Sequence, residues 1–279
     1  MGYCVPENTP SEKVILIILD GLNYEVARDC LGNLMAYVEL FKARLFKLRC
    51  ELPSLSRPMY ETIITGTRPI DHGVVHNDII RNSRIESIFS LARSQKLTTA
   101  AAAFHWVSEL YNDCPFEMME GRYQNDPEQL IQHGIFYWQE QYPDSHLFAD
   151  AEHLRVNNDP DFLLIHPMNI DHAGHRSGLL SADYHLAAKT VDTVLAEYMQ
   201  KWLPLGYQIL VTSDHGMNAE CNHGGTTREE REVPLFLLGD SFSWLDDLQP
   251  EQLHICGIVC ETLGIRDHGK LLPSRPGLA

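Results

Sequence analysis

The chain has 279 residues, of which 44% are hydrophobic, and its formal net charge is −16. This length and apolar content suffice for one large α/β domain with a sizeable core. Because so acidic a surface repels polyanions, the composition argues against binding to a nucleic-acid polymer. A small anionic substrate stays compatible if bound cations dominate the local field.

The beginning of the chain carries no recognisable targeting signal. Residues 1–12 lack the basic start and apolar core of a signal peptide. Pro6 stands where an N-myristoylation motif following Gly2 would have Ser or Thr, and the apolar run at 14–19 is too short to cross a bilayer. We therefore expect a cytoplasmic protein with no membrane partner.

The cysteines are scattered along the chain and form no CxxC pair. An odd number of scattered cysteines favours free thiols in a reducing compartment. Cys221 lies two residues before His223, and we interpret it as a bystander rather than a metal ligand. The full set is Cys4, Cys30, Cys50, Cys114, Cys221, Cys256 and Cys260.

The first predicted strand covers 13–20 and is apolar until it ends in Asp20, which Gly21 follows. A carboxylate at the carboxyl end of a buried strand occupies the position at which open α/β sheets bind ligands. Asp20 could instead cap the helix predicted at 24–31. A short strand is predicted next, at 48–52.

Residues 53–60 predict a loop that leads into a helix ending near Gly66. Ser56 lies at this junction, where backbone N–H groups have no helical partner. Such a place suits a nucleophile that attacks an anionic centre. The plainer interpretation makes Ser56 the N-cap of the helix.

The next part of the chain is predicted as a turn-rich loop at 67–77, a helix at 87–95 and an alanine-rich strand at 97–104. The region 105–160 is less regular, and we interpret it as a small lid or the wall of a substrate pocket. Most of its large apolar residues would be ordinary core residues in the alternative interpretation. They are Trp106, Tyr111, Phe116, Met118, Met119, Tyr123, Tyr137 and Trp138.

A buried strand predicted at 162–165 precedes Asp171 and His175. These two residues lie four apart with Gly174 between them, so a tight turn could direct both at one metal ion. A helix is predicted at 182–203, because its apolar residues recur at helical spacing.

The run at 209–211 is apolar and rich in β-branched residues, as in a buried parallel strand. It leads into Asp214 and His215, and His223 follows eight residues later. Carboxylate oxygen and imidazole nitrogen at the mouth of a sheet are ligands suited to zinc. Asp214 could also simply cap a turn in which His215 packs.

The chain closes with a predicted strand at 233–238 and a helix at 253–263. No internal repeat, low-complexity tract or linker divides it. Strands that alternate with helices in this way predict one α/β domain over 1–279, with a mainly parallel central sheet flanked by helices.

Six segments carry the polar residues at these strand ends. They are LDG at 19–21, PSLSRP at 53–58 with TG at 65–66, HGVVHN at 72–77, DHAGH at 171–175, SDHGM at 213–217, and HGG at 223–225 ahead of VPLFLLG. In this order they resemble the alkaline phosphatase superfamily, and most closely its branch of type I phosphodiesterases and nucleotide pyrophosphatases. The likeness extends from about residue 13 to 265, and it implies a sheet with helices on both faces.

The resemblance also implies two divalent metal ions, usually zinc with manganese as the alternative, at the carboxyl edge of the sheet. Ser56 would be the nucleophile, because it precedes Gly66 by the spacing of the family's pattern, whereas Ser54 lies two residues too early. The implied ligands form two sets, Asp171, His175 and His223 for one ion, and Asp20, Asp214, His215 and the oxygen of Ser56 for the other.

The chemistry of such a site is coherent. A serine hydroxyl is a poor nucleophile at neutral pH, and a coordinated dication makes its alkoxide accessible. Two ions can also clamp the attacking and leaving oxygens of an in-line displacement at phosphorus. The resemblance therefore implies hydrolysis of a small anionic phosphoryl substrate through a phospho-Ser56 intermediate, with a phosphodiester or phosphonate favoured over a monoester.

Three features depart from the diesterase branch. The nucleophile is Ser56 where Thr is usual. Met59 stands where nucleotide pyrophosphatases usually carry an Asn that donates to the phosphate, so another donor such as Asn77 is needed. Only seven residues separate His215 from His223, where a long insertion is common, so we expect a compact core with a reduced cap.

Related functions remain as alternatives. A sulfatase would need Arg in place of Tyr60, four residues after the modified residue, and a phosphomutase would need room for a larger second domain. A phosphomonoesterase stays open. A non-catalytic metal-binding protein is disfavoured because every expected site position holds a competent residue.

Overall fold

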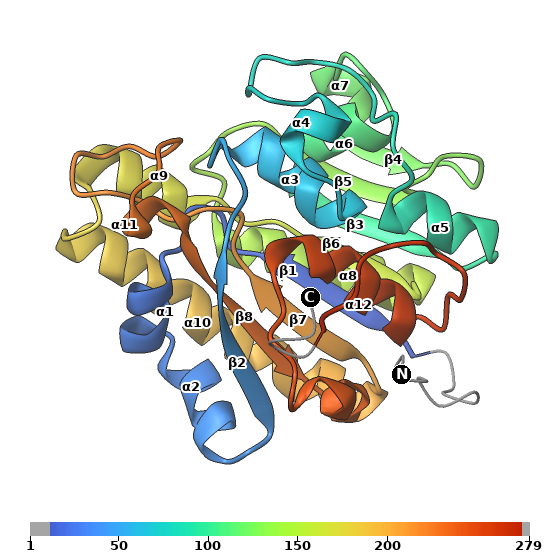
Figure 1. Ribbon diagram of the computed structural model, residues 1–279. Coiled ribbons are helices and arrows are strands. Elements are labelled where there is room, and N and C mark those ends of the chain that lie inside the picture. Colours follow the sequence, from blue (N-terminus) through green and yellow to red (C-terminus); the bar gives the residue numbers. More distant parts are fainter. Residues whose placement is uncertain (1–11, 275–279) are drawn as a thin grey trace.

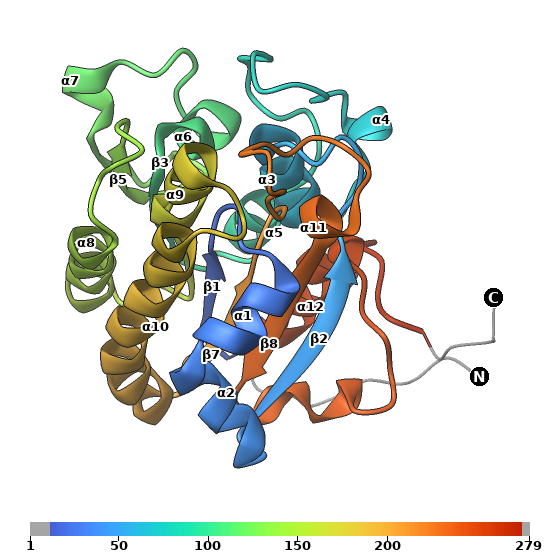
Figure 2. The same ribbon diagram turned by 90° about the vertical axis from the view of Figure 1, so that its left-hand side faces the viewer.

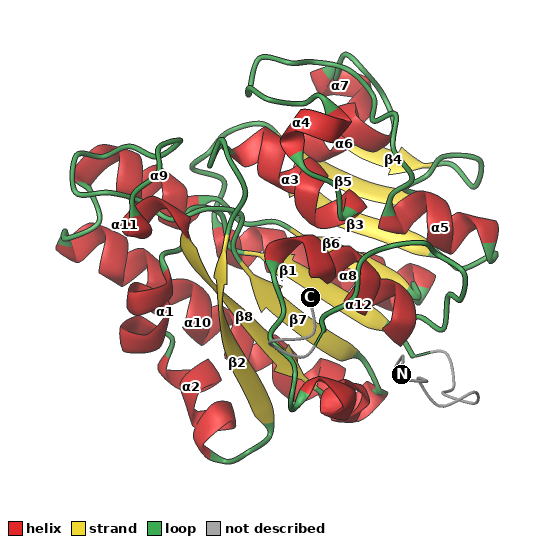
Figure 3. Ribbon diagram, in the orientation of Figure 1, coloured by secondary structure: helices red, strands yellow, loops and turns green. Residues whose placement is uncertain are grey.

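An eight-stranded sheet runs through the centre of the computed structural model, which describes residues 12–274 (Figure 1). The strand order is β2-β8-β7-β1-β6-β3-β5-β4, and Figure 3 shows the strands as one layer. The strands are β1 Val14–Ile18, β2 Ala43–Arg49, β3 Thr99–Phe104, β4 Tyr123–Asn125, β5 His133–Tyr137, β6 Phe162–Ile165, β7 Gln208–Thr212 and β8 Glu232–Leu238.

The strands at the centre of the sheet are parallel. β1 pairs in parallel with β6 and β7, and β3 pairs in parallel with β6 and β5. The pairs β2–β8, β7–β8 and β4–β5 are antiparallel. Every residue of β1, β6 and β7 is buried, which explains why their sequences are apolar without alternation. The predicted α/β fold with a mainly parallel sheet is confirmed.

Helices cover both faces of the sheet, as Figure 2 shows. Ile15 and Ile17 of β1 pack on one face with α1, α2, α8 and α10, while Leu16 packs on the other with α3, α5, α6 and α12. The helices are α1 Tyr24–Cys30, α2 Gly32–Glu39, α3 Ser56–Thr65, α4 Pro69–His72, α5 Ile88–Ser94, α6 His105–Tyr111, α7 Met118–Gly121, α8 Asp144–Asn158, α9 Asn169–Ser177, α10 Ala182–Trp202, α11 Arg228–Arg231 and α12 Ile255–Thr262, with short 3-10 turns η1 Leu203–Leu205, η2 Asp240–Leu245 and η3 Gln252–His254.

The edge strand β2 differs from its prediction. It spans Ala43–Arg49 rather than 48–52, and it pairs with β8 along its whole length. Five of its seven residues are partly buried or exposed, and three of the seven are basic. A strand at the edge of a sheet therefore lacks the apolar run that identified the central strands. Helix α2, which precedes it, was also not predicted.

The region 105–160 is more regular than its sequence indicated. It contains α6, α7, β4, β5 and α8, and β5 extends the parallel part of the sheet beside β3. Tyr111 and Tyr137 are core residues, whereas Met118, Met119 and Trp138 are exposed. The expectation of an irregular segment was wrong, and the lid or pocket wall stays a prediction.

Six cysteines, all except Cys4, lie in the described part of the chain, and each is free. Cys4 and residues 1–11, on which the predictions about a targeting signal rest, lie outside the described residues. Between residues 12 and 274, no helix combines the length and the apolar character needed to cross a membrane.

Candidate metal centre

The predicted ligands meet at the carboxyl edge of the sheet. Asp20 follows β1, Asp171 lies in α9 after β6, and Asp214 with His215 follows β7. Because β1 lies between β6 and β7 with parallel register, these three strand ends are neighbours. The order of the strands thus brings together residues that are far apart in the sequence, at the place where α/β sheets bind ligands.

Neither Asp20 nor Ser56 caps a helix through its side chain. Asn23, not Asp20, caps α1, because its Oδ1 accepts hydrogen bonds from the N–H groups of Glu25 and Val26. Helix α3 begins at Ser56 itself, its N-cap is Leu55, and no side chain caps it. Asp20 and Ser56 are therefore not explained by helix capping.

Three buried carboxyl groups lie close together, and the protein does not supply enough hydrogen-bond donors for all of their oxygens. Asp20, Asp171 and Asp214 are 0%, 3% and 0% exposed. Each has one oxygen without a hydrogen-bond partner among the described residues, namely Asp20 Oδ1, Asp171 Oδ1 and Asp214 Oδ2. Burial raises the pKa of Asp20 to about 7 and the pKa of both other carboxyls well above their usual range. Such a group is stable in its ionised form only beside positive charge.

Three histidines are oriented by the backbone. Nδ1 of His215 lies 2.9 Å from the carbonyl oxygen of Gly216, Nδ1 of His223 lies 2.8 Å from that of Ser54, and Nδ1 of His175 lies 3.1 Å from that of Cys221. A carbonyl only accepts, so each Nδ1 carries the proton and each Nε2 is left with a lone pair. Burial lowers the pKa of His223 to about 4 and that of His215 well below its ordinary value, which keeps both neutral.

The free nitrogen atoms converge on the carboxylates. Nε2 of His215 lies 3.2 Å from Asp214 Oδ2 and 3.5 Å from Asp20 Oδ1. Nε2 of His175 lies 3.4 Å from Asp171 Oδ2 and only 3.1 Å from Nε2 of His223, and two lone pairs at that distance cannot bond to each other. Ligands of one tetrahedral zinc ion are roughly 3.3–3.6 Å apart, so these separations fit metal binding.

The side chains form two groups that share a boundary. Potential ligand atoms of Asp20, Asp214 and His215 all lie within 4.8 Å of one another, and we call this group the inner site. The group Asp171, His175 and His223 is the outer site; His223 Nε2 lies 3.8 Å from Asp171 Oδ1. The His215 ring stacks on the His223 ring with centroids 3.6 Å apart, and His215 is also within 4.8 Å of Asp171 and His223. His215 therefore lies between the two sites.

Ser56 faces this cluster and Ser54 does not. Oγ of Ser56 lies 3.0 Å from Nε2 of His215. Oγ of Ser54 donates to Gly225 O at 2.9 Å and accepts from Gly224 N–H at 3.1 Å. The structure thus brings Ser56 together with the predicted ligands, whereas Ser54 is hydrogen-bonded to the loop that carries His223.

A carboxamide lies beside the candidate nucleophile. Oδ1 of Asn77 accepts a hydrogen bond from the N–H of Arg57 at 3.1 Å. Its Nδ2 has no acceptor among the described residues, and the side chain is half-buried. Met59 is fully buried in the protein interior. Asn77 is therefore placed to donate to an oxygen bound near Ser56, which is the role expected of it in the absence of an Asn at position 59. In the first turn of α3, Asn77 occupies the Arg57 N–H and Pro58 has none, so only the Ser56 N–H is left without a described acceptor.

Two further residues were not found from the sequence. The Tyr60 hydroxyl donates to Asp20 Oδ2, and His166 Nε2 lies 3.1 Å from the same oxygen. Their positions were visible in the sequence, since Tyr60 is one helical turn after Ser56 and His166 comes directly after β6, but their contact with Asp20 was not. Gly21 is also required here, because it has φ of 73° and a Cβ on it would lie 2.8 Å from Asp171 Oδ1.

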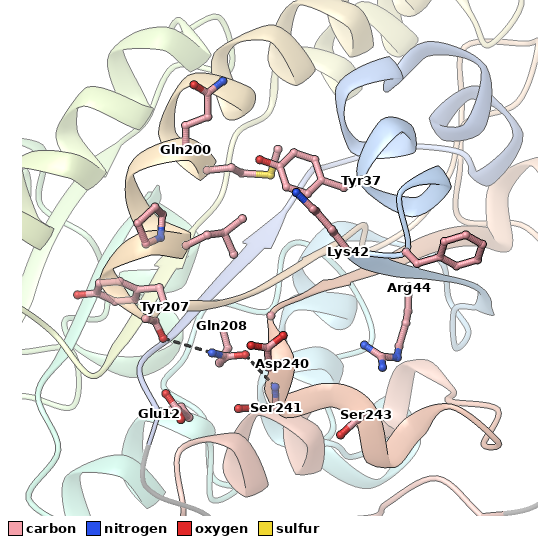
Figure 4. Close-up of a pocket in the computed structure, with 16 residues that line it drawn as sticks. Glu12, Tyr37, Lys42, Arg44, Gln200, Tyr207, Gln208, Asp240, Ser241 and Ser243 are labelled. Carbon is pink, nitrogen blue, oxygen red and sulfur yellow. Dashed lines mark hydrogen bonds between the residues drawn. The ribbon is translucent and has the colours of Figure 1, made fainter.

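A separate cleft of about 990 Å³ opens near the amino end of β7, whereas the candidate metal centre lies at its carboxyl end (Figure 4). Tyr37, Arg44 and Tyr207 help to line it, and so does Gln208, the first residue of β7. The Gln208 amide is satisfied, because it accepts from Ser241 N–H and donates to Gly206 O. None of the predicted site residues lines this cleft, so its size does not make it the functional site.

Comparison with known proteins agrees with the geometry. Residues 14–230 match the model of the family described as type I phosphodiesterase / nucleotide pyrophosphatase. The chain belongs to this family. It is 24% identical over 251 residues to the human GPI ethanolamine phosphate transferase 2, catalytic subunit; the match covers 82% of this chain but 23% of that relative's length.

Solved structures of other proteins show the same fold. Murine ectonucleotide pyrophosphatase / phosphodiesterase 5 superposes with a TM-score of 0.70 and 12% identity, over 94% of this chain and all of that one. The C-terminal periplasmic domain of EcEptC from Escherichia coli, solved as a complex with Zn, gives a TM-score of 0.67 and 13% identity, over 95% of this chain and 86% of that one. The type I phosphodiesterase family and the alkaline phosphatase-like fold predicted from the sequence are thereby confirmed.

Proposed function

We propose that this type I phosphodiesterase family member hydrolyses phosphodiesters through a covalent phosphoserine at Ser56, with two divalent metal ions bound beside it. The observation that carries the proposal is the position of Ser56 Oγ, 3.0 Å from His215 Nε2. At that point unpartnered oxygens of three buried aspartates converge with the free nitrogens of three histidines.

Each site has a coherent set of ligands. Asp20, Asp214 and His215 would hold the inner ion, and Asp171, His175 and His223 the outer ion. Zinc fits carboxylate and imidazole ligands best, with manganese as the alternative, and a relative in fold was solved with Zn. When bound, the ions lower the pKa of a serine hydroxyl or a water and neutralise the charge that develops on the phosphoryl oxygens.

The protein's own groups perform the following steps. Ser56 Oγ attacks phosphorus in line with the leaving group, a bond forms between Oγ and phosphorus, and the opposite ester bond breaks. The released alkoxide takes up a proton and departs as an alcohol, while the Ser56 proton is lost to solvent. Water then attacks the phosphoserine ester, which releases a phosphomonoester and restores the Ser56 hydroxyl. Asn77 Nδ2 donates to a non-bridging phosphoryl oxygen in both steps.

The charges around Ser56 favour a diester or phosphonate over a monoester dianion. Arg57 is the cation next to the nucleophile, but it is 1% exposed, paired with Glu109 at 2.7 Å and packed over the Trp106 ring. It is therefore not free to neutralise a second negative charge on the phosphoryl group. A phosphodiester carries a single negative charge and therefore needs less positive charge around it than a monoester dianion.

Transfer to an acceptor is the second candidate, because a GPI ethanolamine phosphate transferase aligns with 82% of this chain. A transferase would pass the phosphoryl group from Ser56 to an alcohol instead of to water. The chain spans 23% of that relative's length, so the acceptor site of the whole relative is not part of this proposal.

The binding partner and the cellular location of the protein are also proposals. The partner is a small anionic phosphoryl substrate rather than a nucleic-acid polymer or a membrane, and the location is the cytoplasm. These proposals rest on the formal charge of −16 and on the free cysteines of the described region.

A substrate panel tests the function. Zinc-loaded protein should hydrolyse bis(4-nitrophenyl) phosphate and an aryl phosphonate ester faster than 4-nitrophenyl phosphate or 4-nitrophenyl sulfate, and chelation should abolish turnover. Added alcohol should leave the yield of phosphomonoester unchanged for a hydrolase and divert it to a new diester for a transferase. A zinc-loaded protein that turns over only the monoester or the sulfate would contradict the proposal.

A further inference from the structure

The two oxygens of Asp20 have different surroundings. Oδ2 accepts from the Tyr60 hydroxyl and lies 3.1 Å from His166 Nε2. Oδ1 has no hydrogen-bond partner among the described residues and lies 3.5 Å from His215 Nε2. Two donors on one oxygen restrain the rotation of the carboxylate, so the other oxygen is directed toward the inner site.

Both donors belong to fixed parts of the fold. His166 directly follows β6, its N–H donates to Ala102 O at 3.0 Å, and its carbonyl accepts from the Tyr137 hydroxyl at 2.7 Å. Its ring meets the Tyr60 ring edge-on, with centroids 4.5 Å apart. All of these groups are buried, so neither donor can turn away without disturbing the core.

Tyr60 also connects the nucleophile to the metal ligand. It lies four residues after Ser56 in α3, and residues at this spacing share one face of a helix. The same helix face therefore places Ser56 Oγ against His215 and the Tyr60 hydroxyl against Asp20. The hydrogen bond to Asp20 ties α3 to the end of β1.

We propose that Tyr60 and His166 are positioning residues, which aim Asp20 Oδ1 at the inner metal ion and hold α3 so that Ser56 lies against that ion. This inference rests on the proposed two-metal site. Hydrogen bonds to the non-ligating oxygen of a carboxylate fix its orientation, and their loss typically costs about 10- to 100-fold in metal affinity. Neither residue contacts Asp171, His175 or His223 by a described hydrogen bond, so the outer site should be spared.

Tyr60→Phe is the direct test, because it removes only the hydroxyl and keeps the ring. Tyr111→Phe is the matched control: Tyr111 is 3% exposed, and its hydroxyl donates at 2.8 Å to the carboxylate of Glu61, which is not a predicted metal ligand. Zinc binding to metal-free protein is measured by competition with a chromophoric chelator and fitted to two sites. Tyr60→Phe should weaken one site about 10- to 100-fold and leave the other unchanged, whereas Tyr111→Phe should change neither.

Two His166 variants separate positioning from simple packing. The amide nitrogen of Gln is as many bonds from Cα as Nε2 of His, so His166→Gln can still donate to Asp20, whereas His166→Asn cannot reach it. His166→Gln should retain zinc affinity at both sites within a few fold, and His166→Asn should lose one site as Tyr60→Phe does. The zinc-induced rise in Tm, measured on the same proteins, should shrink only for Tyr60→Phe and His166→Asn.

The outcomes distinguish this inference from the proposed function. If the wild-type protein binds no zinc, the two-metal site itself is wrong. If the wild type binds two ions and Tyr60→Phe binds both equally tightly, or if Tyr111→Phe loses as much affinity, the positioning role of Tyr60 is overturned.

Discussion

Ser54 and Ser56 are two residues apart and have separate partners. The Ser54 hydroxyl bonds to the backbone of Gly224 and Gly225, and its carbonyl accepts from His223. The Ser56 hydroxyl meets His215. In the proposed reaction one serine shapes the loop that presents an outer-site ligand, and the other attacks the substrate.

Replacing these serines should therefore have different effects. Ser56→Ala should lower kcat on a phosphodiester by orders of magnitude, because the nucleophile is lost, while metal content stays near the wild-type value. Ser54→Ala should lower zinc affinity at the outer site, because the His223 loop loses two hydrogen bonds worth about 1 kcal/mol each. Steady-state kinetics and metal analysis of both variants make the comparison. Near-normal turnover by Ser56→Ala would refute its assigned role.

The ionisation of Asp20 sets an expected pH dependence. Burial raises its folded pKa from 3.8 to about 7, so its contribution to the stability of the metal-free protein is fully present below pH 3.8 and is lost as the pH rises through 7. The His223 pKa is lowered to about 4, so its contribution is present above pH 6.5 and is lost as the pH falls toward 4. Between pH 5.5 and 7 the folded metal-free site therefore carries a proton on Asp20 and a neutral imidazole at His223.

Zinc must displace that carboxyl proton. The affinity of the protein for zinc should rise by up to about tenfold per pH unit between pH 5.5 and 7 for each proton released. The rise should be steeper when Asp171 and Asp214 also lose protons, because burial raises their pKa values well above normal. Chelator competition at several pH values, with proton release followed in weak buffer, measures this. An affinity that is constant from pH 5.5 to 7 would argue against buried, protonated carboxyl ligands.

At the scale of elements, burial decided what could be predicted. The strands β1, β6 and β7 are buried on both faces, and their apolar runs identified them and located the ligands at their ends. The strands β2 and β4 lie at the two edges of the sheet and are half-exposed, so they had no such run. Helix α8 is 15 residues long, yet only five of them are buried, and its apolar stripe is a narrow one formed by Leu147, Phe148, Ala151 and Leu154.

The same limit applied to the candidate site. Asp171, His175, Asp214, His215 and His223 were predicted as ligands from the order of their segments along the chain. Tyr60 and His166 were missed, because their contact with Asp20 depends on how α3 docks against the ends of β1 and β6. The way in which these elements pack cannot be predicted from a local sequence pattern.

The turn after β1 gives a prediction at this scale. Gly21→Ala combines a positive φ of 73° with a Cβ 2.8 Å from Asp171 Oδ1, so it should displace Asp171 and weaken the outer site. Gly206→Ala is the control, since Gly206 has φ of 88° and no atom within 4 Å of the added Cβ. It should show only the backbone cost of about 1 kcal/mol. Chemical denaturation and zinc titration compare the two, and equal zinc affinity in both would count against the packing argument.

At the scale of the whole molecule, metal binding should join distant parts of the chain. The six ligands follow β1, β6 and β7 or lie in the loop before α11, so each ion connects the ends of neighbouring strands. A ligand that binds only the folded state raises its stability in proportion to the logarithm of its concentration. The candidate metal centre also gathers three buried carboxyls in a chain of formal charge −16, and cations relieve their repulsion.

Protein purified without chelator should therefore contain about two equivalents of transition metal, as elemental analysis would show. Chelation should lower Tm by several degrees and added zinc should restore it. Double replacement of Asp20 and Asp171 by Asn should remove this response. A chain that stays metal-free after incubation with zinc, with an unchanged Tm, would contradict the metal centre.

The stereochemical course at phosphorus tests the central claim most directly. The zinc-loaded enzyme is given a phosphodiester analogue of known configuration, made chiral by sulfur and oxygen isotopes, and the configuration of the phosphomonoester product is determined. Each in-line displacement inverts phosphorus, so attack by Ser56 followed by attack of water should give net retention. Net inversion would mean that water attacks the diester directly, and the phosphoserine mechanism would then be wrong.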